Sequence, residues 1–229
     1  MNLNNVKELV SHSFQEYLAG NEWQVRDKGN GFWIERHKIE RVDFLYLNIK
    51  DHYDEQQLSK YHLVRPFCAI RFHEVETLMS ELQGKFDDPE IVTIQPYEFY
   101  DGQMDDVLPK PLTGAIDKVG LDMQINIMLE YFDKYLKPFF EAYASLAQVD
   151  KKLSNLNDED RLKFLPGSEG KSSLKHMIIA KLAENPDYET IEKKIGSSFE
   201  KVAQKVSRLS FLPELHQKLK TKLESIDPL

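Results

Sequence analysis

The spacing of apolar residues changes near Gly120. Before that point apolar and polar residues mostly alternate, as they do from Arg41 to Ile49, which is the pattern of strands. After it, apolar residues recur every three or four positions almost to the end, which is the pattern of helices. Strands followed by helices predict an α+β fold.

The first half is predicted to begin with a helix that Asn4 or Asn5 caps and that ends before Gly20. The turn residues Gly29 to Gly31 predict a hairpin. Pro66 predicts an edge position or a bulge in its strand. The predicted elements are strands over residues 23–26, 31–37, 41–49 and 63–72, a helix over 74–82 and a β-like run over 91–99.

The strand over residues 41–49 is apolar on both faces, which predicts a central position in the sheet. Short connections favour antiparallel pairing, so we expect an antiparallel sheet of about four or five strands with packed helices. The segment 101–120 is rich in Gly and Pro and is interpreted as a linker. We therefore predict a sheet domain over residues 1–120 and a helical region over 121–229 that packs on it and does not fold independently.

Within the helical region, the pattern predicts helices over residues 158–164, 174–183, 188–208 and 213–225. Pro138 is predicted to begin a new helix or to kink the preceding one. Gly167 to Ser173 resembles a phosphate loop, but Leu165 occupies the position of the first glycine and a helix is predicted in place of the required strand. We therefore expect a loop whose Ser172 or Ser173 caps the following helix.

The chain has 229 residues, of which 41% are hydrophobic, so it is long and apolar enough to form a core. Its net charge of -8 disfavours nucleic-acid binding, because an acidic surface repels phosphates. No apolar run is long enough to span a bilayer, so we expect no membrane partner. The N-terminal residues lack a signal-peptide pattern, and a single cysteine favours a reducing compartment, so the expected location is the cytoplasm.

The sequence has no glycine fingerprint of a cofactor site, and its seven histidines lack metal-ligand spacing. We therefore expect neither a cofactor nor a metal. His62 and His73 have opposite parity along one strand and would face opposite ways. Cys68 lies on the apolar side of its strand and is interpreted as core packing.

One face of the predicted sheet combines cations with aromatic rings. Such a face can bind an acidic or planar ligand, unless the C-terminal helices cover it. A dispersed site would add the two histidines near this strand, because catalytic groups need not be neighbours in sequence. The candidate ligand-binding residues are Tyr46, Arg65, Phe67, Arg71, His62 and His73.

The order of elements and two short motifs carry a resemblance. The motifs are Gly31 to Arg36 in the hairpin strand and Leu136 to Phe140 at a helix start. Over roughly residues 4 to 155, the chain resembles a group of small bacterial α+β domains of unknown function. The resemblance implies an α+β fold and brings no catalytic residues.

Three functions are compatible with the sequence. The acidic charge and the absence of a catalytic signature favour a protein-binding module that recognises a basic partner, such as an immunity-like protein. The alternative is an enzyme or a small-ligand-binding protein with a dispersed site on the sheet face. A third function is that of a structural adaptor, for which exposed apolar patches would imply a homo-oligomer.

Overall fold

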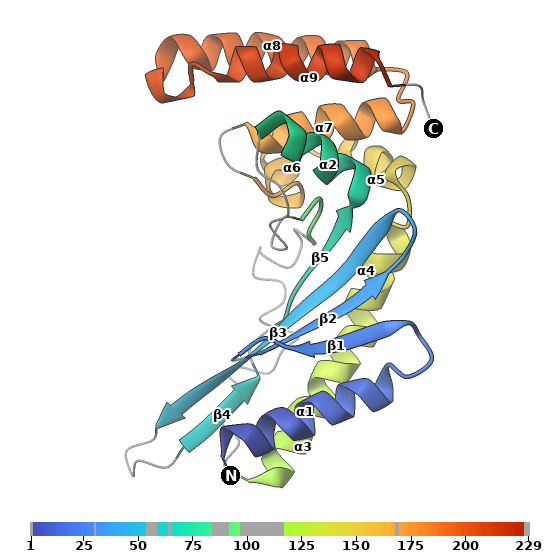
Figure 1. Ribbon diagram of the computed structural model, residues 1–229, viewed down its shortest axis with the longest axis vertical. Coiled ribbons are helices and arrows are strands. Elements are labelled where there is room, and N and C mark those ends of the chain that lie inside the picture. The colour runs from blue at the N-terminus through green and yellow to red at the C-terminus, as the bar shows by residue number, and fades with distance from the viewer. Residues whose placement is uncertain are drawn as a thin grey trace. The chain divides into compact units, whose positions relative to one another are not determined.

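The computed structural model describes residues 2–29, 31–53, 59–63, 66–83, 92–96, 117–167 and 170–226. It has an antiparallel sheet, several helices and a helical C-terminal region, so the predicted α+β class is confirmed (Figure 1). The chain forms two compact units. The first consists of Met1–Ile70 and Pro96–Glu141, and the second of Arg71–Gln95 and Ala142–Leu229. Both units are discontinuous in sequence, whereas the predicted domains divide at residue 120; that division stays a prediction.

The first unit is built around the sheet. Strands β1 to β4 lie in that order and pair antiparallel, and β5 also pairs with β3, so the predicted central position of β3 is confirmed. Its elements are α1 (Leu3–Tyr17), β1 (Trp23–Asp27), β2 (Gly31–His37), β3 (Arg41–Tyr53), β4 (Ser59–Leu63), most of β5 (Phe67–Phe72), α3 (Lys118–Tyr131), the π-helical turn η2 (Phe132–Leu136) and most of α4 (Lys137–Ala142).

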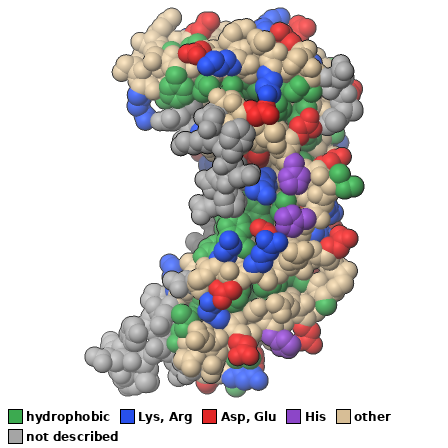
Figure 2. Space-filling model, in the orientation of Figure 1, with side chains coloured by type: hydrophobic (Ala, Val, Ile, Leu, Met, Phe, Trp, Pro, Cys, Tyr) green, Lys and Arg blue, Asp and Glu red, His purple; other side chains and the backbone are tan. Residues whose placement is uncertain are grey.

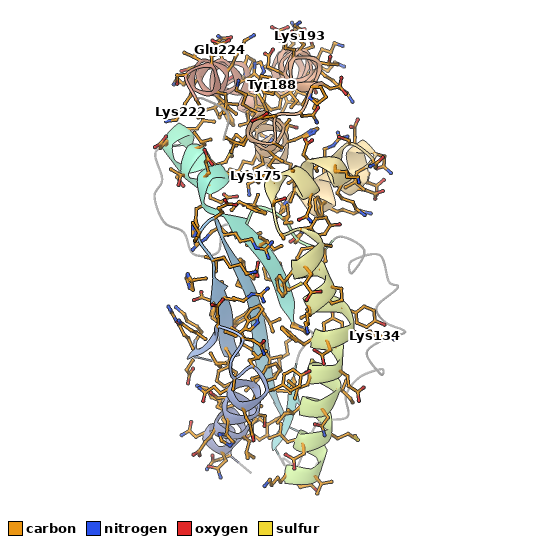
Figure 3. The ribbon with its side chains drawn as sticks, turned by 90° about the vertical axis from the view of Figure 1, so that its right-hand side faces the viewer. Lys134, Lys175, Tyr188, Lys193, Lys222 and Glu224 are labelled. Carbon is orange, nitrogen blue, oxygen red and sulfur yellow. The ribbon has the colours of Figure 1, made fainter. Side chains whose placement is uncertain are left out.

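Helices α1 and α3 run along one face of the sheet (Figures 1 and 3). The register places Ile34 opposite Leu45 and Phe32 opposite Leu47, and all four side chains are buried. Helix α1 contributes buried residues at helical spacing, among them Val6 and Phe14. This alternation on the strands and the three-to-four spacing on the helices produce one apolar layer between sheet and helices.

A buried ion-pair network joins β3 to α4 inside this layer. The carboxylate of Asp43 is fully buried and lies 2.9 Å from Nε of Arg41 and 2.6 Å from Nη2 of Arg36. Arg41 also donates a 2.8 Å hydrogen bond from Nη2 to the carbonyl oxygen of Phe140. The network therefore pairs these buried charges, which would destabilise the fold if they were buried without partners.

The second unit is a helical assembly around α7 (Lys171–Leu182). Nine of the 12 residues of α7 are buried, because α2, α5, α6, α8 and α9 all contact it. Helices α8 and α9 lie side by side (Figure 1). The other elements of this unit are α2 (His73–Gln83), α5 (Leu146–Leu153), α6 (Asp158–Phe164), α8 (Tyr188–Lys205), the 3₁₀ turn η3 (Ser207–Leu209) and α9 (Leu212–Glu224).

Several predicted boundaries need correction. The strand predicted over 63–72 is two strands, β4 and β5, and Pro66 lies between them because it cannot donate to a ladder. Strand β3 continues to Tyr53, beyond its predicted end at Ile49. Within the predicted β-like run over 91–99, residues 92–96 form only a bridge at Ile94. The linker predicted over 101–120 lies outside the described residues up to position 116, and α3 begins at Lys118.

Two predicted caps are also wrong. Asn2, rather than Asn4 or Asn5, caps α1 by accepting a 2.9 Å hydrogen bond from the backbone nitrogen of Asn5. Gly170, with φ of 85°, holds the N-cap position of α7 in place of Ser172 or Ser173. At Pro138, by contrast, the expected irregularity is present, because the π-helical turn η2 precedes α4 there.

Candidate functional site

The sequence-predicted site residues are divided between the two units. Tyr46 on β3 and Phe67 on β5 are half-buried and belong to the first unit. Arg71, half-buried, and His73, exposed at the start of α2, belong to the second. His62 lies in β4, and its side chain and all of Arg65 lie outside the described residues. The role of these six residues in ligand binding stays a prediction.

The aromatic part of the predicted sheet face is present. The ring of Trp33, which pairs with Tyr46 across the strands, lies 5.8 Å from the Tyr46 ring and 5.2 Å from the Phe44 ring. The Phe44 ring lies 6.1 Å from that of Phe67. Trp33 is the member that sequence reasoning missed, although its alternation with Phe32 and Ile34 places it on this face.

A cavity of about 550 Å³ lies within the second unit, between α5, α6, α7 and α8. This volume is in the range of small-molecule sites. Fifteen residues line it: Leu153, Ser154, Asp158, Arg161, Leu162, Ser172, Ser173, His176, Asn185, Asp187, Thr190, Ile191, Lys194, Ile195 and Ser198. None of them is among the residues predicted from the sequence as ligand-binding.

The pocket has a buried base and an exposed rim. His176 and Ile195 are only 7% and 8% exposed, whereas Leu162 on the rim is 57% exposed. The lining residues of α8, from Thr190 to Ser198, recur every three or four positions and so form one continuous face of the helix. The pocket therefore follows the length of this helix face.

His176 is the central titratable residue of the pocket. Its Nε2 atom is buried and has no hydrogen-bond partner among the described residues. Burial, followed by the positive charges of Arg161 and Lys194, lowers the pKa of His176 from 6.5 to about 4, and Asp158 opposes this shift. The imidazole is therefore neutral at pH 7 and carries a polar atom that no described group satisfies.

Three charged side chains meet near this histidine. Asp158 and Arg161 are one turn apart on α6 and form a 2.7 Å ion pair. Lys194 from α8 lies 3.6 Å from the same carboxylate. Arg161 also donates from Nη2 to the carbonyl oxygen of Leu156, which fixes the position of its guanidinium group. These contacts hold the pKa of Asp158 below its usual range, first through the Arg161 hydrogen bond and then through Lys194.

Asn185 forms one end of the pocket wall. Its amide nitrogen donates to both carboxylate oxygens of the buried Asp150, at 2.9 and 2.7 Å. Burial raises the pKa of Asp150, and the hydrogen bond from Asn185 opposes this shift. Asp150 therefore holds Asn185 in place from behind the pocket.

Chemically, this arrangement suits binding better than proton transfer. A general base is most effective when its pKa lies near the working pH, and the pKa of His176 lies well below it. The phosphate-loop-like segment borders the pocket, but the hydroxyl of Ser172 donates to the carbonyl oxygens of Leu165 and Gly167. Ser172 is thus engaged in holding its own loop.

One feature of the sequence lies close to this site. Lys175 and His176 directly precede the apolar run from Met177 to Ala180, and both are buried. Ionisable side chains inside a buried helix need partners, and their partners come from other helices. Sequence reasoning could not identify those partners, because they lie on α2, α6 and α8.

Among the described residues, no group of three or more His, Cys, Asp or Glu side chains is arranged to hold a metal ion. Within the same residues, no helix is both long and apolar enough to cross a bilayer. No family model matches the chain, and neither a curated protein nor a solved structure matches it. The resemblance to small bacterial domains thus stays an expectation.

Proposed function

We propose that this protein binds a small organic ligand in the pocket between α5, α6, α7 and α8. The single observation that supports this most strongly is the state of His176. Its Nε2 atom is buried, lacks a partner among the described residues, and belongs to a side chain that lines a cavity of about 550 Å³.

Energetics favour a ligand at this position. A buried polar atom without a hydrogen bond costs about 1–3 kcal/mol of stability. A ligand atom that hydrogen-bonds to Nε2 would remove this cost, and apolar residues of the pocket, such as Ile191 and Ile195, would gain contact with the ligand. Burial of the base and exposure of the rim give such a ligand a route of entry.

The test is a thermal-shift screen of small polar and amphipathic compounds. Compounds that bind the pocket should raise the melting temperature of the wild type and should raise that of Ser198→Trp less, because its indole would occupy part of the cavity. Ser197→Trp is the matched control, because Ser197 is exposed, lies next to Ser198 on α8 and does not line the pocket. Equal shifts in both variants would contradict the proposal.

A second candidate function is the recognition of a basic protein. It is supported by the net charge of -8 and by the half-buried rings of Trp33, Tyr46 and Phe67, since Trp and Tyr are enriched at protein interfaces. On the face seen in Figure 2, acidic and basic side chains are interspersed, so the charge argument rests on the chain as a whole. We rank this function second for that reason.

A cytoplasmic location belongs to the same proposal. The chain has a single cysteine, Cys68, which is free and buried, and this is compatible with a reducing compartment.

A pull-down from the native cytosol should recover a basic protein with the wild type and less of it with Tyr46→Ser. Equal recovery with both, or the absence of a basic protein, would count against this second function.

A further inference from the structure

The ligand class can be inferred from the donors and charges around His176, and this step rests on the proposed function. We propose that the pocket binds an anionic oxygen group, a carboxylate or a phosphate ester, carried on a small apolar body. The anion would lie beside His176, Arg161 and Lys194. The apolar body would contact Leu162, Ile191 and Ile195.

The unused hydrogen-bonding atoms of the pocket favour an acceptor. Nε of Arg161 is buried and, like Nε2 of His176, has no hydrogen-bond partner among the described residues. An arginine has five donors and no acceptor, so only an acceptor atom can satisfy this nitrogen. The neutral imidazole can donate from Nε2 as well, in one of its two tautomers. An acceptor oxygen of a ligand would therefore match the unused nitrogen of either side chain.

The balance of charge next to His176 is positive. Arg161 and Lys194 contribute two cations, and Asp158 is the carboxylate that pairs with both. Both cations line the same pocket as His176, and both lower its pKa. Charge-assisted hydrogen bonds are stronger than neutral ones, so a ligand anion gains more here than a neutral acceptor does.

The second acidic residue of the pocket lies away from this position. Asp187 precedes Lys194 by seven residues, and at a rise of about 1.5 Å per residue this separates them by roughly 10 Å along α8. That distance is about one Debye length at physiological ionic strength, so Asp187 weakly opposes an anion at Lys194. The negative charge that faces the proposed anion directly is Asp158.

The apolar residues of the pocket complete the ligand's outline. Leu162 on α6 is 57% exposed. Ile191 is half-buried and Ile195 is 8% exposed, and both lie on the α8 face that lines the pocket. An apolar body of a few carbons would remove this surface from water while its anion lies at His176.

The experiment compares probes that share one apolar body. Hexanoate, hexyl phosphate, hexanamide and 1-hexanol are titrated into the full chain by calorimetry. We expect at least one of the two anions to bind about tenfold more tightly than both neutral probes, because each hydrogen bond to a charged group adds to the affinity. Preference between the two anions identifies the carboxylate or the phosphate as the group recognised.

Two variants and one spectroscopic signature make the test specific. Lys194→Gln should weaken anion binding several-fold, whereas Lys193→Gln should not, because Lys193 is equally exposed but does not line the pocket. Bound hexyl phosphate, which stays anionic near pH 4, should also raise the pKa of His176 above about 4 in an NMR titration of its ring protons. If the anion bound elsewhere on the protein, its addition would leave that pKa unchanged.

The outcomes separate this inference from the proposed function. Equal affinity for hexanoate, hexyl phosphate and 1-hexanol would overturn the inference that the ligand is an anion, but not the proposal that the pocket binds a ligand. Equal effects of Lys194→Gln and Lys193→Gln would overturn the position assigned to the anion. If none of the four probes bound, the inferred ligand class, an anion on an apolar body, would be wrong. Only the absence of any binder in the broader thermal-shift screen would overturn ligand binding itself.

Discussion

The ammonium group of Lys175, a residue labelled in Figure 3, lies 3.1 Å from Oε1 of Glu76, and both side chains are less than 10% exposed. Lys175 also donates to the carbonyl oxygen of Val92, and Thr93 donates to the same carboxylate oxygen at 2.8 Å. Burial lowers the pKa of Lys175, and the charge of Glu76 opposes this shift. The pair therefore fixes α7, α2 and residues 92–93 to one another inside the second unit.

Removal of one partner should be costly. Lys175→Met leaves the Glu76 carboxylate buried without its cation, so we expect a loss of about 3 kcal/mol in the free energy of unfolding. The double variant Lys175→Met with Glu76→Gln should recover about half of this loss or more, because Gln still accepts from Thr93 and carries no charge. Urea denaturation of both variants measures the difference.

The control is an exposed pair of the same unit. Lys193 lies 3.5 Å from Glu189 on α8, and the two side chains are 72% and 83% exposed. Lys193→Met should change the free energy of unfolding by less than about 1 kcal/mol, since solvent screens such pairs. If Lys175→Met costs no more than Lys193→Met, the buried pair does not have the structural role described.

Protonation of His176 should make the protein less stable in mild acid. Its pKa is about 4 in the folded state and 6.5 when exposed, so the unfolded chain binds more protons between these values. Stability that is present above pH 6.5 is then lost as the pH falls toward 4, by about 2–3 kcal/mol at pH 4.5. Denaturation curves at pH 7 and 4.5 measure this loss, which should be larger in the wild type than in His176→Gln by about this amount.

His12→Gln provides the matched comparison. The His12 side chain is 76% exposed on α1, so its removal should leave the acid-induced loss as large as in the wild type. Arg161, Lys194 and Asp158 are the charged groups that face His176, and all three remain in both variants. A wild type whose pH dependence equals that of His176→Gln would refute the neutral, buried state of the imidazole.

The sequence was sufficient where one local rule decides the outcome. The glycine turn and the alternation after it predicted β2 from Gly31 to His37, as found. The helical spacing likewise predicted α6 over residues 158–164, the range that it occupies. It was insufficient where two rules compete. Pro66 was expected to disturb one strand, but it separates two strands that both pair with β3.

The candidate pocket could not be predicted, for a related reason. His176 is one of seven histidines, and local spacing gives it no ligand partner. Its neighbours Arg161 and Lys194 are 15 and 18 residues away in sequence, on two other helices. The aromatic sheet face was more accessible to prediction, because Phe44 and Tyr46 alternate on one strand.

Gly31 permits the close approach of β2 to β3. A Cβ atom at this position would lie 2.4 Å from the backbone oxygen of Leu47, on the neighbouring strand. Gly31→Ala should therefore destabilise the first unit by about 2 kcal/mol, because backbone rather than a flexible side chain must move. Gly20→Ala is the comparison: Gly20 has φ of 80° but open space around it, so it should cost about 1 kcal/mol. A smaller cost at Gly31 than at Gly20 would disprove the crowding.

Gln124 connects helix α3 to the backbone of β4. Its Oε1 atom accepts a 2.9 Å hydrogen bond from the backbone nitrogen of Leu63, and its Nε2 atom donates to the carbonyl oxygen of Tyr61 at 3.2 Å. The side-chain amide thus takes the place of a backbone amide at this strand, which is at the end of the path from β1 to β4. Sequence patterning missed it, because a glutamine on a helix is ordinarily exposed.

Gln124→Leu should remove both of these hydrogen bonds while keeping an apolar side chain of similar size. We expect a loss of about 2–4 kcal/mol in the free energy of unfolding, since two buried backbone groups lose their Gln124 partner. The backbone amide of Leu63 should also exchange its hydrogen faster in the variant, which NMR detects directly. Asn126→Leu makes the same kind of replacement at an exposed position of α3 and should change neither quantity appreciably. Unchanged exchange at Leu63 in Gln124→Leu would show that the glutamine does not hold this strand.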